Sequence, residues 1–373
     1  MRIENPFITI GYAGPRYFCD RVAETQKMQE LLRNGWNITL ISPRKMGKTG
    51  LIHHLFHTLK SSGGKQVCAY IDIYATSQLS EFVSAFCKGV FSQLDSPTAA
   101  FLKKLTRFFK SCRPVITTDE LTGQPAVTLD FVPSQSEQTL KEVFDYLNHL
   151  GQPCCVAIDE FQQIQNYPEK NVEALLRSYI QAVPNVRFIF AGSQCHLMEE
   201  MFLIPNRPFY QSTRQISLDA IDRENYYAFA SGFFTDAHRT LPQPVFNQVY
   251  DTFDGHTWYV QTLLNALYMT PAKQVGDGDV RQATGAILDE NTYTYQHIFS
   301  LLSSNQRILL KAIAREGCVE QPTAGSFLSR HGFKNGSCVS RAASSMLASE
   351  YLYKTPSGLT VYDRFFALWL ARL

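Results

Sequence analysis

Five short, mainly apolar segments recur along the first part of the chain, and the one at residues 154–159 shows no alternation between apolar and polar positions. They lie at residues 36–42, 67–73, 154–159, 186–192 and 214–218. Uninterrupted apolar runs of this kind are typical of strands that are buried on both faces, as in a parallel sheet. Amphipathic helical segments separate the runs, so the pattern predicts an α/β fold with a five-stranded parallel core sheet.

The alternation of strands and helices breaks between residues 103 and 134. Two β-prone segments, at residues 114–118 and 127–131, flank a stretch that contains Gly123 and Pro125. This arrangement predicts a β-hairpin inserted at about residues 112–132. The hairpin could pair with an edge of the sheet, which is the interpretation we favour, or project as a contact arm.

The chain becomes helical after residue 220. Four helices are predicted at residues 226–234, 244–253, 257–268 and 277–299, and they indicate a small helical lid. Three helices and a hairpin follow at residues 305–315, 323–331, 339–349 and 351–361, an order typical of a winged helix-turn-helix. The pattern therefore predicts a core at residues 1–220, a helical lid at 221–300 and a winged-helix domain at 301–373.

The first apolar run leads into a turn that ends in Gly-Lys-Thr and then into a helix. The segment reads Ser42-Pro43-Arg44-Lys45-Met46-Gly47-Lys48-Thr49-Gly50. Backbone N–H groups at a helix start hold phosphates, a lysine neutralises them and a threonine hydroxyl holds Mg²⁺, so this is the layout of a phosphate-binding P-loop. One position departs from the pattern G-x-x-x-x-G-K-[ST], because Ser42 replaces the first glycine. We expect residues 42–50 to bind nucleotide phosphates, with Lys48 on the β- and γ-phosphates and Thr49 on the metal.

Two adjacent acids, Asp159 and Glu160, end the run at residues 154–159. The carboxyl ends of parallel strands are where open α/β sheets bind ligands. Asp159 is placed to hold Mg²⁺ through water, and Glu160 to orient and deprotonate an attacking water. The alternative is that the pair only caps the next helix. We favour the catalytic interpretation because a Gly-Lys-Thr turn precedes the pair in the chain.

The run at residues 186–192 ends in Gly192, Ser193 and Gln194. In P-loop ATPases with a strand between the two Walker motifs, a polar side chain at this strand tip contacts the γ-phosphate or the attacking water. Ser193 or Gln194 would do so here. Ser193 could equally serve as the N-cap of a helix at residues 196–202, and the sequence does not decide between these roles.

Composition narrows the possible classes of protein. The chain has 373 residues, is 45% hydrophobic and has a formal net charge of +2, which is typical of an ordinary folded protein of two or three domains. Any nucleic-acid binding must come from a local patch, because the net charge is near neutral. No apolar run reaches the length of a membrane span, and the N-terminus lacks the apolar region of a signal peptide. We therefore expect a cytoplasmic protein without membrane contact.

The motifs, in this order, resemble those of the archaeal-type ATPases, relatives of the AAA+ and STAND proteins. Phe18-x-Asp20-Arg21 resembles the family's F-x-x-R-E box, with Val22 in place of the acid. Residues 42–49 resemble its G-P-R-R-x-G-K-[TS] loop (Walker A), residues 158–161 its Walker B motif, and residues 191–193 its G-S strand end. Residues 362–370 resemble its D-P-x-F-x-x-W segment, with Arg364 in place of proline.

The resemblance implies an Mg-ATP-binding hydrolase that holds ATP between its core and its lid and acts as a nucleotide-dependent switch. Phe18 and Arg21 would flank the purine. The family's P-L-Y-G-R segment is interrupted here by Gln211-Ser212, so an arginine finger would have to be Arg207 or Arg214, and we expect slow hydrolysis.

The alternative is a non-catalytic, nucleotide-gated module whose C-terminal domain binds DNA or a protein. Residues 323–361 carry a modest basic cluster that includes Arg330, His331, Lys334 and Arg341. DNA is therefore one possible partner of this domain, and a protein partner or self-association is the other possibility.

Overall fold

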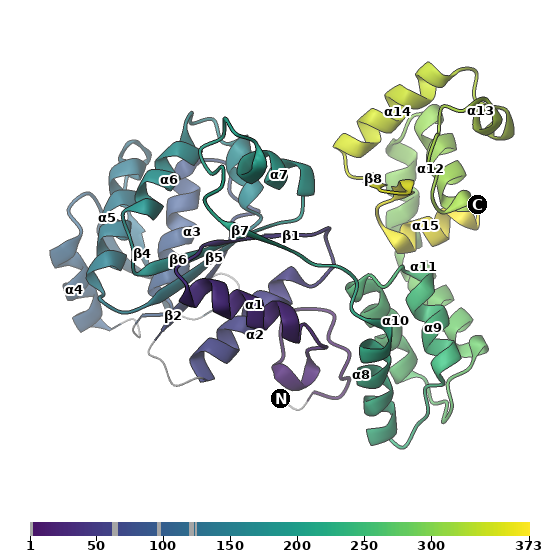
Figure 1. Cartoon of the computed structure of the whole chain (residues 1–373), viewed down its shortest axis with the longest axis horizontal. Helices are drawn as coiled ribbons and strands as arrows, with labels where there is room; N and C mark the ends of the chain where they lie inside the picture. The colour runs from purple at the N-terminus through teal and green to yellow at the C-terminus, as the bar shows by residue number, and fades with distance from the viewer. Residues whose placement is uncertain (1–2, 62–65, 95–97, 119–122, 124) are drawn as a thin grey trace. The chain divides into compact units, whose positions relative to one another are not determined.

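The computed structural model describes residues 3–61, 66–94, 98–118, 123 and 125–373 (Figure 1). The turn of the expected hairpin, at residues 119–122 and 124, lies outside the described residues. The chain forms two compact units. One comprises Ile10–Tyr226, and the other comprises Met1–Thr9 together with Tyr227–Leu373.

A five-stranded parallel sheet forms the centre of the first unit, which confirms the predicted core sheet. The strands are β1 (Ile38–Ile41), β2 (Val67–Asp72), β5 (Cys154–Asp159), β6 (Val186–Gly192) and β7 (Arg214–Ser217), in the order β2-β5-β6-β1-β7. Because the strands are parallel, the ends of β1, β5 and β6 that carry the sequence motifs meet at one edge of the sheet.

Both faces of the sheet are covered, as the lack of alternation predicts. Val156 and Ile158 of β5 belong to one hydrophobic core, whereas Cys155 and Ala157 belong to the other. The first core is closed by α3 (Leu79–Phe91), α5 (Ser136–His149) and α6 (Val172–Gln181), and the second by α1 (Val22–Arg33) and α2 (Lys48–Ser61) (Figure 1). Helix α7 (Cys195–Leu203) follows β6.

The insertion between α3 and α5 differs from its prediction in two ways. It begins with a helix that the sequence pattern did not indicate, α4 (Ala99–Phe108), and continues as β3 (Arg113–Thr118) and β4 (Pro125–Asp130). The two strands pair with each other in a separate antiparallel sheet, so the predicted pairing with the sheet edge is wrong. Val127 and Leu129 of β4 are buried in the core that α3 also lines, and this packing holds the hairpin against helices.

The second unit contains a helical bundle made of α8 (Arg223–Asp236), α9 (Gln243–Thr252), α10 (Thr257–Met269) and α11 (Asp277–Leu301). The N-terminal segment completes this bundle, which the sequence pattern did not indicate. Phe7 is fully buried and lies within 5.7 to 6.4 Å, between ring centroids, of Phe229, Phe233, Phe234 and Tyr268. The Asn265 side chain donates a hydrogen bond to the Phe7 carbonyl at 2.7 Å.

A winged helix ends the second unit, as predicted. It consists of α12 (Ser304–Glu316), α13 (Gly325–His331), α14 (Gly336–Ala348), the β8–β9 hairpin (Leu352–Thr355 and Gly358–Val361) and a final helix, α15 (Arg364–Ala371). Phe365 of α15 packs edge-on against Phe253 and Tyr259 of the bundle, with ring centroids 5.0 and 5.4 Å apart. The bundle and the winged helix thus share one aromatic core.

Candidate nucleotide-binding site

The loop between β1 and α2 has the backbone that a phosphate cradle requires. Gly47 has a φ of 95° and Lys45 a φ of 68°, so the chain turns sharply before α2 begins at Lys48. Glycine adopts such angles without strain, and this explains Gly47. Ser42 is buried and is not among the residues with positive φ, so a side chain is tolerated where the motif has its first glycine.

Lys48 is buried in the loop that precedes it. Its ammonium donates hydrogen bonds to the carbonyls of Ser42 at 2.7 Å and Pro43 at 3.1 Å. Burial lowers the pKa of Lys48, whereas the nearby Asp159 and Glu160 carboxylates act in the opposite direction. The ammonium therefore lies inside the loop, where phosphate oxygens could replace the carbonyls as its acceptors.

Asp159 lies at the centre of a compact oxygen cluster at the end of β5. Its Oδ2 accepts hydrogen bonds from the Thr49 hydroxyl at 2.8 Å and from the Tyr70 hydroxyl at 2.7 Å. Its Oδ1 accepts the backbone N–H of Glu160 at 3.0 Å. Burial and the Asp159 charge both raise the pKa of Tyr70, so the tyrosine is a proton donor in this pair. The structure thus places the two predicted metal-binding residues, Thr49 and Asp159, in direct contact.

Glu160 adopts a left-handed backbone conformation, with a φ of 55°. Its Oε2 accepts hydrogen bonds from Ser193 Oγ at 2.8 Å and from Gln162 Nε2 at 2.5 Å. Arg44 Nε in turn donates to Ser193 Oγ at 3.3 Å. A chain of hydrogen bonds therefore runs from the loop, through the tip of β6, to the acid that follows β5.

The alternative helix-capping roles of these residues are not seen in the structure. Glu160 precedes a 3₁₀ turn (Phe161–Asn166), but its side chain makes no capping hydrogen bond there. The residue at the N-cap of α7 is Gln194 rather than Ser193, and it makes no side-chain capping bond either. A side chain at position 192 would displace its neighbours, because an added Cβ would lie 2.4 Å from Gln162 Oε1 and 2.5 Å from Met198 Sδ.

Phe18 lies against the start of α2. Its ring stacks on His54 with centroids 4.4 Å apart, and a Cβ added to Gly50 would lie 3.3 Å from its Cε2 atom. The Tyr12 hydroxyl and His54 Nδ1 form a hydrogen bond at 3.0 Å. Aromatic side chains therefore lie against the first two turns of α2, which follow the phosphate loop.

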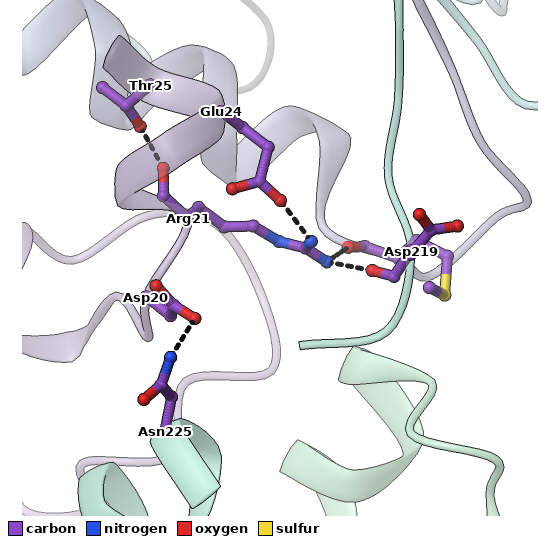
Figure 2. Close-up of polar contacts among 7 residues, drawn as sticks. Asp20, Arg21, Glu24, Thr25, Asp219 and Asn225 are labelled. Atoms are coloured by element: carbon purple, nitrogen blue, oxygen red, sulfur yellow. Dashed lines mark hydrogen bonds and ion pairs between the residues drawn. The ribbon is translucent and has the colours of Figure 1, made fainter. Parts of the chain in front are cut away.

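Arg21 joins three segments of the first unit (Figure 2). It is 5% exposed and has a left-handed φ of 62°. Its guanidinium donates to Glu24 Oε1 and to the Asp219 carbonyl, each at 2.7 Å, and has a longer contact of 3.4 Å to the Met46 carbonyl. Glu24 thus pairs with Arg21, and Arg21 connects the phosphate loop to the chain that leaves β7.

The two candidate arginine fingers are both engaged inside the first unit. Arg207 forms ion pairs with Glu173 and, at 3.4 Å, with Glu200. The Arg214 guanidinium lies over the Trp36 ring, 4.1 Å from its centroid. Among the described residues, neither arginine forms a hydrogen bond or an ion pair with Asp159 or Glu160.

The C-terminal basic cluster is only partly available. Arg330 forms an ion pair with Glu316 at 2.5 Å, and His331 contacts the same carboxylate at 2.7 Å. On α14, Ser340, Arg341, Ser344 and Ser345 are exposed. The exposed face of α14 therefore carries small polar residues and a single cation.

Comparisons with known proteins cover most of the chain. A family model described as an ATPase domain predominantly from Archaea matches residues 18–263. A second model, described as a "probable winged helix domain", matches residues 293–372. A search of curated proteins gives no match. Among the described residues, no helix has both the length and the apolar character that a membrane crossing requires.

Several solved structures share this fold at low sequence identity. The Walker-type ATPase PABY2304 of Pyrococcus abyssi has a TM-score of 0.68 at 15% identity, over 99% of this chain and 100% of that one. The Aeropyrum pernix ORC2 protein, in ADPNP-ADP complexes, has a TM-score of 0.59 at 16% identity, over 98% and 95%. The Aeropyrum pernix ORC1 protein, in complex with DNA, has a TM-score of 0.54 at 12% identity, over 99% and 96%.

Proposed function

Because the chain belongs to the family of ATPase domains found predominantly in Archaea, we propose that it binds Mg-ATP at the loop of residues 42–50 and hydrolyses it slowly. The observation that carries this proposal is the convergence of Lys48 and Thr49, at the start of α2, with Asp159 and Glu160, at the end of β5, at one edge of the sheet. The structural neighbour from Aeropyrum pernix that was solved with ADPNP and ADP supports a nucleotide as the ligand.

The oxygen atoms near the loop fit a magnesium ion. Mg²⁺ prefers hydroxyl, carboxylate and phosphate oxygens, and Thr49 and Asp159 provide the first two within 2.8 Å of each other. When bound, the ion would neutralise charge on the nucleotide phosphates. Thr49 would hold it directly, Asp159 would hold it through water, and Tyr70 would keep the Asp159 carboxylate oriented.

Glu160 is the proposed general base for an attacking water. Ser193 and Gln162 donate hydrogen bonds to Oε2 of Glu160, so we propose that these two residues orient its carboxylate. Gln194, at the end of β6, is the other candidate for a contact with the γ-phosphate. Its side chain makes no helix-capping hydrogen bond. Slow turnover is proposed because Arg207 and Arg214 are bound elsewhere, and an arginine finger typically contributes about 10³-fold or more to the rate.

Phe18 is proposed as the contact to the purine, since it lies beside Gly50 and His54 at the start of α2. Arg21 is proposed to support the phosphate loop, because its hydrogen bonds go to Glu24 and to main-chain carbonyls.

The winged helix is proposed to contact DNA or a protein through residues 323–361. Nucleotide binding in the first unit would control this contact, so the molecule would act as a nucleotide-dependent switch. A non-catalytic, nucleotide-gated module is the second candidate, and the engaged arginines favour it.

Hydrolysis is tested by replacing the proposed base. Glu160→Gln keeps the shape of the side chain but removes its basicity, so ATP binding should persist while turnover falls by about 100-fold or more. Turnover is measured as phosphate release, and binding is measured by titration of the same preparations. Glu199→Gln, an exposed acid on α7, serves as the control and should leave turnover unchanged. Equal turnover of wild type and Glu160→Gln would exclude Glu160 as the base.

A further inference from the structure

The part of the insertion that runs from α4 to the start of β3 has an unusual charge distribution. Lys103, Lys104, Arg107, Lys110 and Arg113 lie within it, and no aspartate or glutamate occurs between residues 96 and 118. Without these five cations the formal net charge of +2 would fall to −3. A local excess of five positive charges therefore lies in a segment that the nucleotide site does not use.

The structure exposes the cations of this segment to solvent. All five side chains are exposed, and we call them the basic face. Lys103, Lys104 and Arg107 lie on consecutive turns of α4 and line an open surface hollow of about 340 Å³ together with Phe108. The opposite side of the helix is anchored, because Phe101, Leu105 and Phe109 are at most 4% exposed in the hydrophobic core.

No acidic group among the described residues forms an ion pair with the basic face, although Asp130 lies opposite Arg113 in the β3–β4 ladder. Within that part of the chain, none of the five side chains forms an ion pair or a hydrogen bond. Glu142 lies nearby, but its carboxylate accepts the backbone N–H groups of Lys110 and Ser111 and the Ser111 hydroxyl. Five cations held close together repel one another, so an external anion would stabilise this surface.

The chemistry of the basic face indicates which class of partner it binds. A helix that lies on a membrane inserts an apolar face, but the apolar face of α4 is already buried in the protein. Protein interfaces are anchored by exposed aromatic or large apolar residues, and between residues 98 and 113 no large hydrophobic side chain is exposed. A phosphodiester backbone needs neither, because its affinity comes from charge neutralisation.

We propose that the basic face binds the phosphate backbone of nucleic acid without reading its sequence. Lys103 and Arg107 are one helical turn apart, about 6 Å along the axis, which is close to the rise of two nucleotides along one strand, about 3.4 Å each. Lys110 and Arg113 follow α4 in the chain and are exposed as well. This contact does not depend on nucleotide hydrolysis or on the winged helix.

The test measures binding of the full-length protein to a fluorescent 30-base-pair duplex of mixed sequence at increasing NaCl concentrations. The triple variant Lys103→Gln, Lys104→Gln, Arg107→Gln should weaken binding by about tenfold or more at 100 mM salt. The slope of log K against log[NaCl] should become shallower by about 2 to 3, since each lost phosphate contact removes about 0.9. Lys103→Arg with Lys104→Arg preserves the charge and should bind like the wild type.

Further variants distinguish the basic face from the remaining cations of the protein. Lys27→Gln, Lys141→Gln and Lys170→Gln neutralise three exposed lysines elsewhere in the same unit, and together they should leave the slope unchanged. Lys334→Gln with Arg341→Gln tests the winged helix separately. The proposal is overturned if the triple variant keeps the wild-type slope, if the wild type binds no duplex, or if it binds phosphatidylserine vesicles but not DNA. ATP binding by the triple variant should match that of the wild type, so a failure of the nucleotide assignment would be seen independently.

Discussion

Asp159 and Tyr70 show how single side chains prepare the site. Asp159 is 4% exposed, and burial of a carboxylate is costly unless hydrogen bonds compensate for the lost water. Thr49, Tyr70 and the Glu160 backbone provide three such bonds. The acid that is proposed to hold the metal shell is therefore held in one orientation before any ligand binds.

Removing the Tyr70 hydroxyl should destabilise the first unit. Tyr70→Phe deletes one hydrogen bond to a charged group, so the free energy of unfolding should fall by about 1 to 2 kcal/mol. Chemical denaturation monitored by circular dichroism measures this change. Tyr74→Phe is the matched control, because Tyr74 is 60% exposed and its loss should stay within about 0.5 kcal/mol. Equal effects of the two substitutions would show that the Tyr70–Asp159 bond contributes nothing.

The sequence predicted some of these residues and missed others for a definite reason. Lys48, Thr49, Asp159 and Glu160 belong to short contiguous motifs whose geometry is local. Tyr70 and Gln162 carry no such signal. Tyr70 meets Asp159 only because β2 and β5 are neighbours, 89 residues apart in the chain, and strand order is not encoded in the pattern of a single strand. Gln162 was missed because glutamine two residues after an acid is common.

At the scale of elements, the insertion depends on one buried carboxylate. Glu142 of α5 is 8% exposed and closes the turn between α4 and β3 by accepting the backbone N–H groups of Lys110 and Ser111. Burial by itself would raise the pKa of Glu142, but these backbone bonds and those from the Gln138 and Ser111 side chains lower it. The ionised carboxylate therefore stabilises the turn that supports the basic face.

Glu142→Gln should destabilise the protein in a pH-dependent manner. A folded-state pKa below the usual value near 4.5 means that the ionised group stabilises the fold above that pH. The wild type should therefore exceed the variant by about 1 to 3 kcal/mol at pH 7. This difference should shrink as the pH falls below about 4.5 and through the folded-state pKa. Asp145→Asn, exposed on the same helix, should show little difference at either pH. A Glu142→Gln effect independent of pH would contradict the assignment.

The elements themselves were predictable where their pattern is regular. The five strands of the core sheet and the winged helix follow from the short apolar segments and from the order of helices and hairpin. The position of β3 and β4 could not be predicted, because the sequence pattern of a hairpin does not indicate which surface the hairpin packs against. Helix α4 was not predicted, because basic residues dominate the segment and only Phe101 and Leu105, four residues apart, indicate its buried side. The family resemblance drawn from the motifs is confirmed by the match over residues 18–263.

At the scale of the whole molecule, the second unit behaves as one packed body. Phe365, Phe366 and Trp369 of the winged helix lie among Phe253, Tyr259 and Tyr295 of the helical bundle. Arg364 adds an ion pair to Asp254 at 3.0 Å. A change imposed on the bundle by nucleotide would therefore be passed to the winged helix through this aromatic core.

Limited trypsin digestion should report such a change. Lys273 is exposed in the loop between α10 and α11. Arg239 donates hydrogen bonds to the carbonyl of Ala272 in this loop and to that of Tyr268 at the end of α10. If nucleotide shifts the arrangement of the bundle, cleavage after Lys273 should differ in rate between ADP and a non-hydrolysable ATP analogue. Lys273→Gln should abolish this fragment and so identify it. Identical cleavage with ADP, with the analogue and without nucleotide would argue for a rigid assembly.

Nucleotide binding at the loop is the central claim, and calorimetric titration of Mg-ATP into wild type and Lys48→Ala tests it most directly. Lys48 provides the buried ammonium of the loop, so its loss should weaken binding by about 100-fold or more, the equivalent of about two charge-assisted hydrogen bonds. Lys60→Ala, an exposed lysine near the other end of α2, should bind like the wild type. If Lys48→Ala binds Mg-ATP as tightly as the wild type, the loop of residues 42–50 does not hold the phosphates.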